Sequence, residues 1–388
     1  MADSDDLAVA PLAELRKRRS AKWRTYDASI IPLTVAEMDF DLAEPVAEIL
    51  HAAVAAGDTG YAMPAPALGD AFAGFAGDRW GWEVDARQVT AMTDVGVGVV
   101  EVLRACIRSG DTVVISPPVY PPFFDWLIEV GTHQREVPLA RDGSGTWRLD
   151  LPALEQAFAS GPAAYVLCNP QNPVGRVHER DELAELVRLA ARHDVIIVSD
   201  EIHGPLVLPG RDFTPILTVP GAADHAVALV SASKAFNLAG LKCAGIVTGA
   251  DRMADVVAKL PADGRWRTGH LGVLATVAAF QHGGPWLDRL LATLLHNRDH
   301  LDALLRSELP AIRWTPPQAT YLAWLDCTSV GYAESAHQHF LDDAKVALEP
   351  GVRFGRAFDG FVRLNFATSP DILDEAVVRM ARSLVAEV

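Results

Sequence analysis

Short, almost wholly apolar runs recur through the middle of the 388-residue chain, and they constrain its fold more than any other feature. Because these runs are short and do not alternate with polar residues, they predict strands that are buried on both faces. Between two of them, residues 181–192 carry apolar side chains at helical spacing. Strands that alternate with helices predict a mostly parallel sheet covered by helices on both sides. The four clearest runs are residues 112–115, 164–167, 195–198 and 226–230.

A different pattern begins after Gly283. Residues 285–309 show a long helical pattern, strand-like stretches follow at 321–325 and 361–366, and a final helix is predicted to begin near Pro370. This order predicts a smaller α+β domain. The sequence therefore divides into an N-terminal arm with part of the small domain at 1–48, a large ligand-binding domain at 49–284, and a small C-terminal domain at 285–388.

The balance of charge limits the partners of this protein. Its formal net charge is -16, so nucleic acid is not expected as the main partner, because binding to phosphate backbones needs a basic face. The chain shows no apolar signal core near its first residues and no apolar stretch long enough to span a bilayer. We therefore expect a cytoplasmic protein that acts on a small molecule and makes no membrane contact.

The four cysteines have no spacing that is typical of a metal or redox pair. A disulfide framework is not expected in a chain of this length, and reduced thiols are the natural interpretation. The sequence therefore predicts no metal site. The cysteines are Cys106, Cys168, Cys243 and Cys327.

Two of the predicted strands end in ionisable residues. Lys234 closes the segment 231–234, directly after an apolar strand, where burial would lower the pKa of its amine and make it nucleophilic. Ser231 and Ser233 offer hydroxyl donors for a phosphate, although a solvated lysine after a strand is the alternative interpretation. Asp200 follows a second strand, at the edge of a parallel sheet where ligands bind, and could keep a pyridinium nitrogen protonated. Its alternative role is a helix N-cap.

Three loops carry further candidates. Asn172 lies in the proline-rich segment 169–175, and its amide can donate to an anionic oxygen, although the bare pattern is only a turn. Val95 and Gly96 open a predicted helix, whose first amides can bind phosphate if the preceding Asp94 is turned away as a cap. Tyr120 is held by four prolines, so its ring could stack on a flat cofactor or simply pack in the core.

Two cations complete the set. Lys242 lies in the segment 240–242 and could pair with a phosphate. Arg363 stands in an apolar run, where a guanidinium is costly without an anionic partner. A substrate carboxylate is one candidate partner of Arg363, and an interdomain salt bridge is the other.

In this order, the motifs resemble those of the fold-type-I pyridoxal-phosphate enzymes, the aminotransferase class I and II family, over almost the whole chain. The resemblance implies an α/β, aspartate-aminotransferase-like fold, with a mostly parallel seven-stranded sheet between helices in the large domain. It also implies pyridoxal 5'-phosphate as cofactor and a homodimer with active sites at the subunit interface. In that family the residue matching Lys234 holds the cofactor as a Schiff base, and the residue matching Asp200 pairs with the ring nitrogen.

The resemblance also implies roles for the remaining candidates. Asn172 would contact the phenolic oxygen of the cofactor, Tyr120 would stack on the ring, and Arg363 would bind the substrate α-carboxylate. Tyr61 matches a tyrosine that reaches the site of the other subunit, where it contacts cofactor and substrate. His203 stands where ordinary aminotransferases usually carry tyrosine. The other predicted cofactor-binding residues are Val95, Gly96, Ser231, Ser233 and Lys242.

Within the family, segments such as 19–23, 35–40 and 200–203 are similar to those of the cystathionine β-lyase-type C–S lyases. This predicts a lyase that cleaves a cysteine-type S-conjugate to a thiol, pyruvate and ammonia. An aminotransferase that uses an amino acid and a 2-oxo acid is the alternative, and a non-catalytic pyridoxal-binding regulator is a third hypothesis. Thr34, where tryptophan is common, and Val174, in place of a usual threonine, depart from the pattern.

Overall fold

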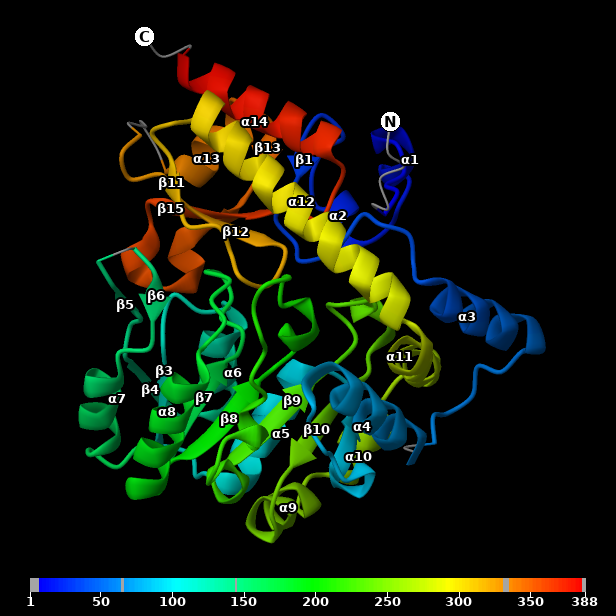
Figure 1. Ribbon diagram of the computed structural model, residues 1–388, viewed down its shortest axis with the longest axis vertical. Helices are drawn as coiled ribbons and strands as arrows, with labels where there is room; N and C mark the ends of the chain where they lie inside the picture. Colours follow the sequence, from blue (N-terminus) through cyan, green and yellow to red (C-terminus); the bar gives the residue numbers. More distant parts are fainter. Residues whose placement is uncertain (1–6, 64–65, 144, 331–334, 386–388) are drawn as a thin grey trace.

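The computed structural model of the protein describes residues 7–63, 66–143, 145–330 and 335–385. Figure 1 shows a large lower part and a smaller upper part, joined by the long helix α12 (Gly284–Glu308). This helix lies where the sequence predicts one over residues 285–309. The boundaries of the three parts drawn from the sequence stay a prediction.

The large part is built on a seven-stranded sheet in the order β2-β10-β9-β8-β7-β3-β4. Neighbouring strands run parallel except at β10, which is antiparallel to both of its neighbours. Every residue of β7, β8, β9 and β10 is buried, as uniformly apolar runs predict. The strands are β2 (Val89–Met92), β3 (Thr112–Ile115), β4 (His133–Glu136), β7 (Ala164–Cys168), β8 (Ile196–Asp200), β9 (Ala226–Val230) and β10 (Ala244–Thr248).

Helices cover both faces of this sheet (Figure 1). Successive strand residues point to opposite faces, so Val113 and Ile115 join one core cluster while Val114 joins the other. One face packs against α5 (Val95–Cys106), α6 (Pro122–Val130) and α9 (Asp251–Ala258). The other packs against α4 (Pro66–Trp80), α7 (Leu151–Phe158), α8 (Arg180–Arg192) and α11 (His270–His282), and α3 (Glu44–Ala56) lies against α11.

The smaller part has an antiparallel sheet in the order β11-β12-β15-β14. The N-terminal segment joins it, because β1 (Ile31–Pro32) pairs in parallel with β13 (Val346–Ala347). Its other elements are β11 (Arg313–Trp314), β12 (Leu322–Asp326), β14 (Glu349–Pro350), β15 (Phe361–Asn365), α13 (Ala336–Asp342) and α14 (Pro370–Val385).

Short elements complete the described chain. They are the helices α1 (Leu12–Leu15), α2 (Ala21–Arg24) and α10 (Ala262–Trp266), the hairpin β5 (Ala140–Arg141) and β6 (Trp147–Arg148), and the 3-10 helices η1 (Ala86–Gln88), η2 (Gly204–Leu206), η3 (Ile216–Thr218), η4 (Ala222–Asp224), η5 (Ala239–Leu241), η6 (Gly351–Phe354) and η7 (Arg356–Phe358).

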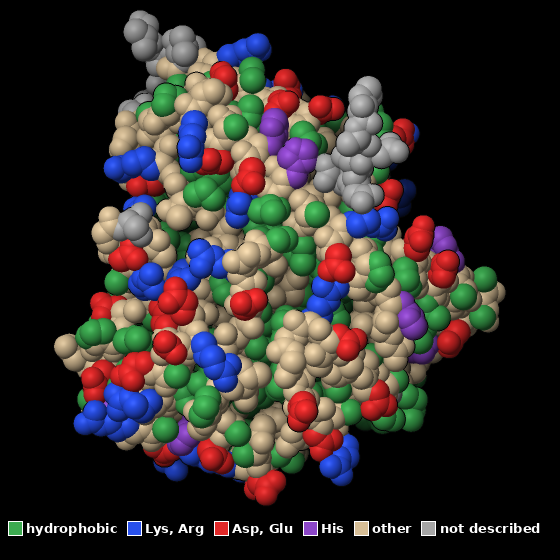
Figure 2. Space-filling view, in the orientation of Figure 1, with side chains coloured by type: hydrophobic (Ala, Val, Ile, Leu, Met, Phe, Trp, Pro, Cys, Tyr) green, Lys and Arg blue, Asp and Glu red, His purple; other side chains and the backbone are tan. Residues whose placement is uncertain are grey.

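The surface mixes charges of both signs. Figure 2 shows Lys and Arg side chains interspersed with Asp and Glu over the face in view. The four cysteines are free thiols, and three of them are buried. Among the described residues, no helix has both the length and the apolar character needed to cross a membrane.

Candidate active site

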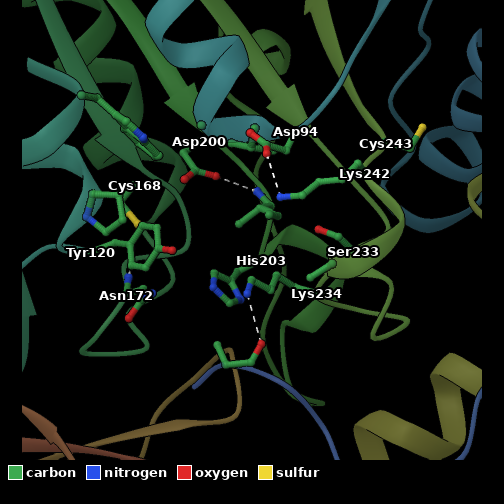
Figure 3. Close-up of a pocket in the computed structure, with 17 residues that line it drawn as sticks. Asp94, Tyr120, Cys168, Asn172, Asp200, His203, Ser233, Lys234, Lys242 and Cys243 are labelled. Atoms are coloured by element: carbon green, nitrogen blue, oxygen red, sulfur yellow. Dashed lines mark hydrogen bonds and ion pairs between the residues drawn. The ribbon is translucent and has the colours of Figure 1, made fainter. Parts of the chain in front are cut away.

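A cavity of about 300 Å³ lies where the carboxyl ends of the central strands meet the first turn of α5. Figure 3 shows Asp94 with Lys242 at one end, Tyr120 with Asn172 on one side, and Lys234 with Ser233 on the other. The sheet brings these residues together because parallel strands deliver the residues after them to one edge. Nine of the predicted site residues line the cavity: Val95, Gly96, Tyr120, Asn172, Asp200, His203, Ser233, Lys234 and Lys242.

Lys234 follows β9 and points into the cavity (Figure 3). Its Nζ donates a hydrogen bond of 3.1 Å to the carbonyl oxygen of Ala36. Burial, and then the positive charge of Arg363, lower the pKa of the Lys234 amine to about 8. More of the amine is therefore neutral near physiological pH than in an ordinary lysine, and the neutral form is the one that attacks a carbonyl carbon.

Asp200 is the last residue of β8, and its side chain is buried. One carboxylate oxygen accepts a hydrogen bond of 3.1 Å from the amide of Ile202. Burial raises the pKa of Asp200 to about 6, against the opposing effects of that amide and of Lys234. No α-helix begins at Asp200, so it is not a helix N-cap. A cationic group in the cavity would favour the ionised carboxylate, and a protonated ring nitrogen is such a group.

His203 and Tyr120 both line the cavity, and in Figure 3 His203 lies beside Lys234. Burial lowers the pKa of His203, so its imidazole is neutral, and its Nδ1 has no hydrogen-bond partner among the described residues. Burial raises the pKa of Tyr120, whose ring meets Trp126 edge-on at 6.2 Å. Each ring therefore presents an uncharged surface to whatever occupies the cavity.

The start of α5 forms the charged end of the cavity. Asp94 caps this helix, with one oxygen 2.8 Å from the Val97 amide, and its other oxygen lies 3.1 Å from Nζ of Lys242. The Asp94 carboxylate thus acts as the N-cap of α5, which is the condition set above for binding a phosphate at this helix start. At Gly96 an added Cβ would come within 3.0 Å of the Trp126 side chain, so glycine lets this ring pack closely against the first turn of α5.

Arg363 reaches the site from β15 and does not itself line the 300 Å³ cavity. It is buried, and its two terminal nitrogens donate hydrogen bonds of 3.1 Å to Asn172 Oδ1 and 3.0 Å to the carbonyl of Thr34. Its Nε has no partner, and no carboxylate within the described ranges forms an ion pair with it. The structure therefore does not show an interdomain salt bridge, and it leaves a buried positive charge without a counter-ion.

Two predicted residues lie away from the cavity. The hydroxyl of Ser231 donates to the carbonyl of Cys243 at 2.7 Å and accepts from the amide of Ser233 at 3.1 Å. Its one hydrogen is therefore used within the chain, and the predicted contact between Ser231 and a phosphate is not supported. Tyr61 lies on the loop between α3 and α4 with 89% of its surface exposed, so it does not pack on its own domain.

Sequence reasoning missed the part played by Ala36 and Tyr321. The carbonyl oxygen of Ala36 accepts hydrogen bonds from Lys234 and, at 3.0 Å, from the hydroxyl of Tyr321, so it anchors the active-site amine. The role of a backbone carbonyl cannot be predicted from residue type. The only sequence signal at this position was the similarity of segment 35–40 to the cystathionine β-lyase-type C–S lyases. Cys168 also lines the cavity, and its position directly before the 169–175 loop is the only signal that could have found it.

These features fit pyridoxal phosphate. Lys234 is a buried amine of lowered pKa, Asp200 is a buried carboxyl that a cation would ionise, and Val95 and Gly96 at the start of α5 line the cavity where helix amides can bind a phosphate. A neutral imidazole and a phenol complete walls that can hold a flat ring. Fold and site together define an enzyme that depends on pyridoxal phosphate.

Comparisons with known proteins specify the family. The profile described as aminotransferase class I and II matches residues 28–380, and the chain belongs to this family. A Mycobacterium leprae protein named as a candidate cystathionine beta-lyase is 45% identical, over 98% of this chain and 99% of that protein. The cystathionine beta-lyase PatB of Bacillus subtilis is 35% identical, over 91% of this chain and 92% of PatB.

The fold is confirmed by solved structures. A Corynebacterium diphtheriae protein, named as a candidate PLP-dependent beta-cystathionase, superposes with a TM-score of 0.92 at 33% identity, covering 98% of this chain and 99% of that one. The aspartate-aminotransferase-like fold and the pyridoxal phosphate cofactor expected from the sequence are therefore correct.

Proposed function

We propose that this enzyme is a C–S β-lyase that converts a cysteine-type S-conjugate to a thiol, pyruvate and ammonia. The observation that carries the proposal is the near full-length similarity to cystathionine β-lyases, in a chain whose cavity places Lys234 between Asp200 and the carbonyl of Ala36. We propose that the protein acts in the cytoplasm. Its substrate would be a small sulfur amino acid.

Bound pyridoxal phosphate supplies a carbonyl carbon that takes up the substrate amine and a ring that withdraws electrons from the substrate α-carbon. Lys234 would hold the cofactor through its neutral amine. When free, the same amine would be placed to remove the α-proton of the substrate, and its pKa of about 8 suits proton transfer near neutral pH. Asp200 would keep a proton on the ring nitrogen and so maintain the withdrawal of electrons.

Arg363 and Asn172 orient the substrate. Their mutual hydrogen bond fixes the guanidinium beside the cavity, and its unpaired Nε leaves a donor for a carboxylate. With the α-carboxylate held there, the α-proton would face Lys234, and its loss would send the electron pair toward the β-carbon. The β-carbon–sulfur bond would then break, and the sulfur would leave as a thiolate that takes up a proton. One water molecule would convert the remaining three-carbon fragment to pyruvate and ammonia.

The products distinguish this function from transamination. Purified protein supplied with pyridoxal phosphate should release thiol and pyruvate in equal amounts from L-cystathionine. With an amino acid and a 2-oxo acid it should form little new amino acid. New amino acid without thiol would establish an aminotransferase instead, and an inert protein that still binds pyridoxal phosphate would indicate a regulator.

We propose further that the enzyme is a homodimer in which Tyr61 reaches the site of the other subunit. The support is an exposed apolar group on α3 and the loop after it, where Tyr61, Met63 and Val54 expose 89%, 73% and 61% of their surface. Large exposed side chains grouped in this way are typical of surfaces that a partner covers.

Subunit exchange tests this arrangement. Tyr61→Ala and Lys234→Ala proteins should each be weakly active or inactive, but a mixed dimer carries both lesions in one site and neither in the other. After complete exchange of an equal mixture, half of the dimers are mixed, so activity should rise to about a quarter of the wild-type value. If labelled subunits exchange and no activity returns, Tyr61 does not act across the interface.

A further inference from the structure

A second cavity, of about 560 Å³, adjoins the active site. Ala239 lines both cavities, and the consecutive residues Ala36 and Glu37 line the first and the second in turn. The segment that receives the hydrogen bond from Lys234 therefore also forms a wall of this second space. A substrate that extends beyond the reacting carbon would find room here.

Glu37 contributes a carboxylate to the lining of the second cavity. Its backbone position is fixed by two hydrogen bonds, because its carbonyl oxygen accepts from Asn365 at 2.7 Å and from Lys22 at 3.3 Å. Its half-buried side chain has no hydrogen bond or ion pair with any residue that the structure describes. The Glu37 carboxylate lines the second cavity, and its charge helps to hold up the pKa of Lys234 against the larger effect of burial.

The neighbouring carboxylate shows what a purely structural role looks like. Asp39 is buried, with one oxygen 2.7 Å from Lys22 Nζ and the other 3.0 Å from Trp23 Nε1. Its charge is fully compensated within the fold. Glu37, only two residues earlier, has no such partner among the described residues. A charged side chain that is partly removed from water is stabilised by a hydrogen-bond or ion-pair partner.

A cation lines the same cavity. Arg19 is exposed and has no hydrogen-bond or ion-pair partner within the described part of the chain. The adjacent Arg18 is occupied, because it donates to the carbonyls of Met38 at 3.3 Å and Asp39 at 3.0 Å. The cavity thus combines one free carboxylate and one free guanidinium with apolar side chains, among them Leu42 and Leu50.

We propose that this cavity is a distal subsite for substrates that carry a second amino-acid group beyond the sulfur atom. Glu37 binds the distal ammonium group and Arg19 the distal carboxylate. The inference rests on the proposed lyase function and deepens it, because it assigns the enzyme to thioethers with two amino-acid ends, such as L-cystathionine, over simple S-alkyl cysteines. An ammonium group near Glu37 would supply the partner that the fold does not.

The test compares two substrates that differ only beyond the sulfur. Glu37→Gln should reduce the ratio of kcat/KM for L-cystathionine to kcat/KM for S-ethyl-L-cysteine by roughly tenfold or more, since a hydrogen bond to a charged group is lost. Arg19→Gln should reduce the same ratio. Glu44→Gln is the matched control: it makes the same substitution at an exposed glutamate in the first turn of α3 that does not line the cavity, and it should leave the ratio unchanged.

A binding measurement separates this inference from the proposed function. In Lys234→Ala protein loaded with pyridoxal phosphate, the change in cofactor absorbance reports binding of each amino acid without turnover. L-cystathionine should bind more tightly than S-ethyl-L-cysteine, and Glu37→Gln should remove most of that difference. If wild-type protein releases no thiol but this difference is present, the lyase function fails and the subsite stands. If Glu37→Gln weakens both ligands equally, Glu37 does not recognise the distal amino-acid group and the subsite is wrong.

Discussion

Lys234→Ala should abolish turnover, with a loss of roughly 10⁴-fold or more, because one side chain both holds the cofactor and moves the α-proton. The visible absorbance of the lysine-bound cofactor should also disappear. No other amine within the described residues can replace it, since Lys22 is paired with Asp39, and Lys242 is paired with Asp94 at the opposite end of the cavity. Activity, absorbance and borohydride reduction followed by peptide mapping measure the effect.

Lys259→Ala is the control for this experiment, because Lys259 is exposed on the surface after α9 and should be dispensable. The assignment of Lys234 would be overturned by a variant that keeps the absorbance and carries the reduced cofactor on a different lysine. Loss of absorbance with retained turnover would instead separate cofactor attachment from proton transfer.

Asp200→Ala should lower kcat by about three orders of magnitude, because the ring nitrogen loses the charge that keeps it protonated. The adjacent Glu201 offers a matched control. Burial raises the pKa of Glu201 to about 8, so it is mostly uncharged near neutral pH, and one oxygen accepts from Ser199, Asn169 and the Ile216 amide. Glu201→Gln keeps that oxygen and that neutral state, so its kcat should stay near the wild-type value.

The comparison of Asp200→Ala with Glu201→Gln separates the effect of removing a charge at the ring nitrogen from the effect of altering a buried carboxyl group. Both residues are buried carboxyl groups next to each other in the chain, but only Asp200 lines the cavity. Circular dichroism should show both variants folded. A near-normal kcat for Asp200→Ala would mean that the ring nitrogen has a different partner.

The main sheet and most of the site could be predicted because one physical rule governs both. Uniformly apolar runs are buried strands, and the residues that follow parallel strands meet at one edge. Lys234 and Asp200 were found in this way, although each alone had a second interpretation. What decided between the interpretations was the set of motifs in order, and the structure then placed them around one cavity.

The bonding of the Ser231 hydroxyl within the chain has a structural cause. The strand β10 was not identified in the sequence, and it lies antiparallel beside β9, with Gly245 opposite Val230. This pairing brings the carbonyl of Cys243 to the hydroxyl of Ser231. A strand that returns in the opposite direction breaks the simple alternation on which the prediction rested, so the inward orientation of Ser231 could not be anticipated.

Long-range partners were also beyond the sequence. The ion pair of Asp94 and Lys242 joins residues 148 positions apart. Arg363 bonds to Asn172 and Thr34, at separations of 191 and 329 residues. Apolar patterns specify which face of an element is buried, but they carry no information on which two polar groups meet at the end of separate elements.

The docking of the N-terminal segment onto the small sheet has a consequence for the order of folding. Residues 31–33 pair with residues 345–347, and Asn365 holds the carbonyls of Val35 and Glu37. A ribosome-bound chain that has produced only the seven-stranded sheet therefore has Lys234 in place, but no support from Asn365 for the wall that contains Ala36. Closing a loop of more than 300 residues comes late. Until residues 31–33 pair with residues 345–347, the amine of Lys234 in the nascent large domain would stay exposed to water. Cofactor that binds during synthesis would therefore meet an incomplete site.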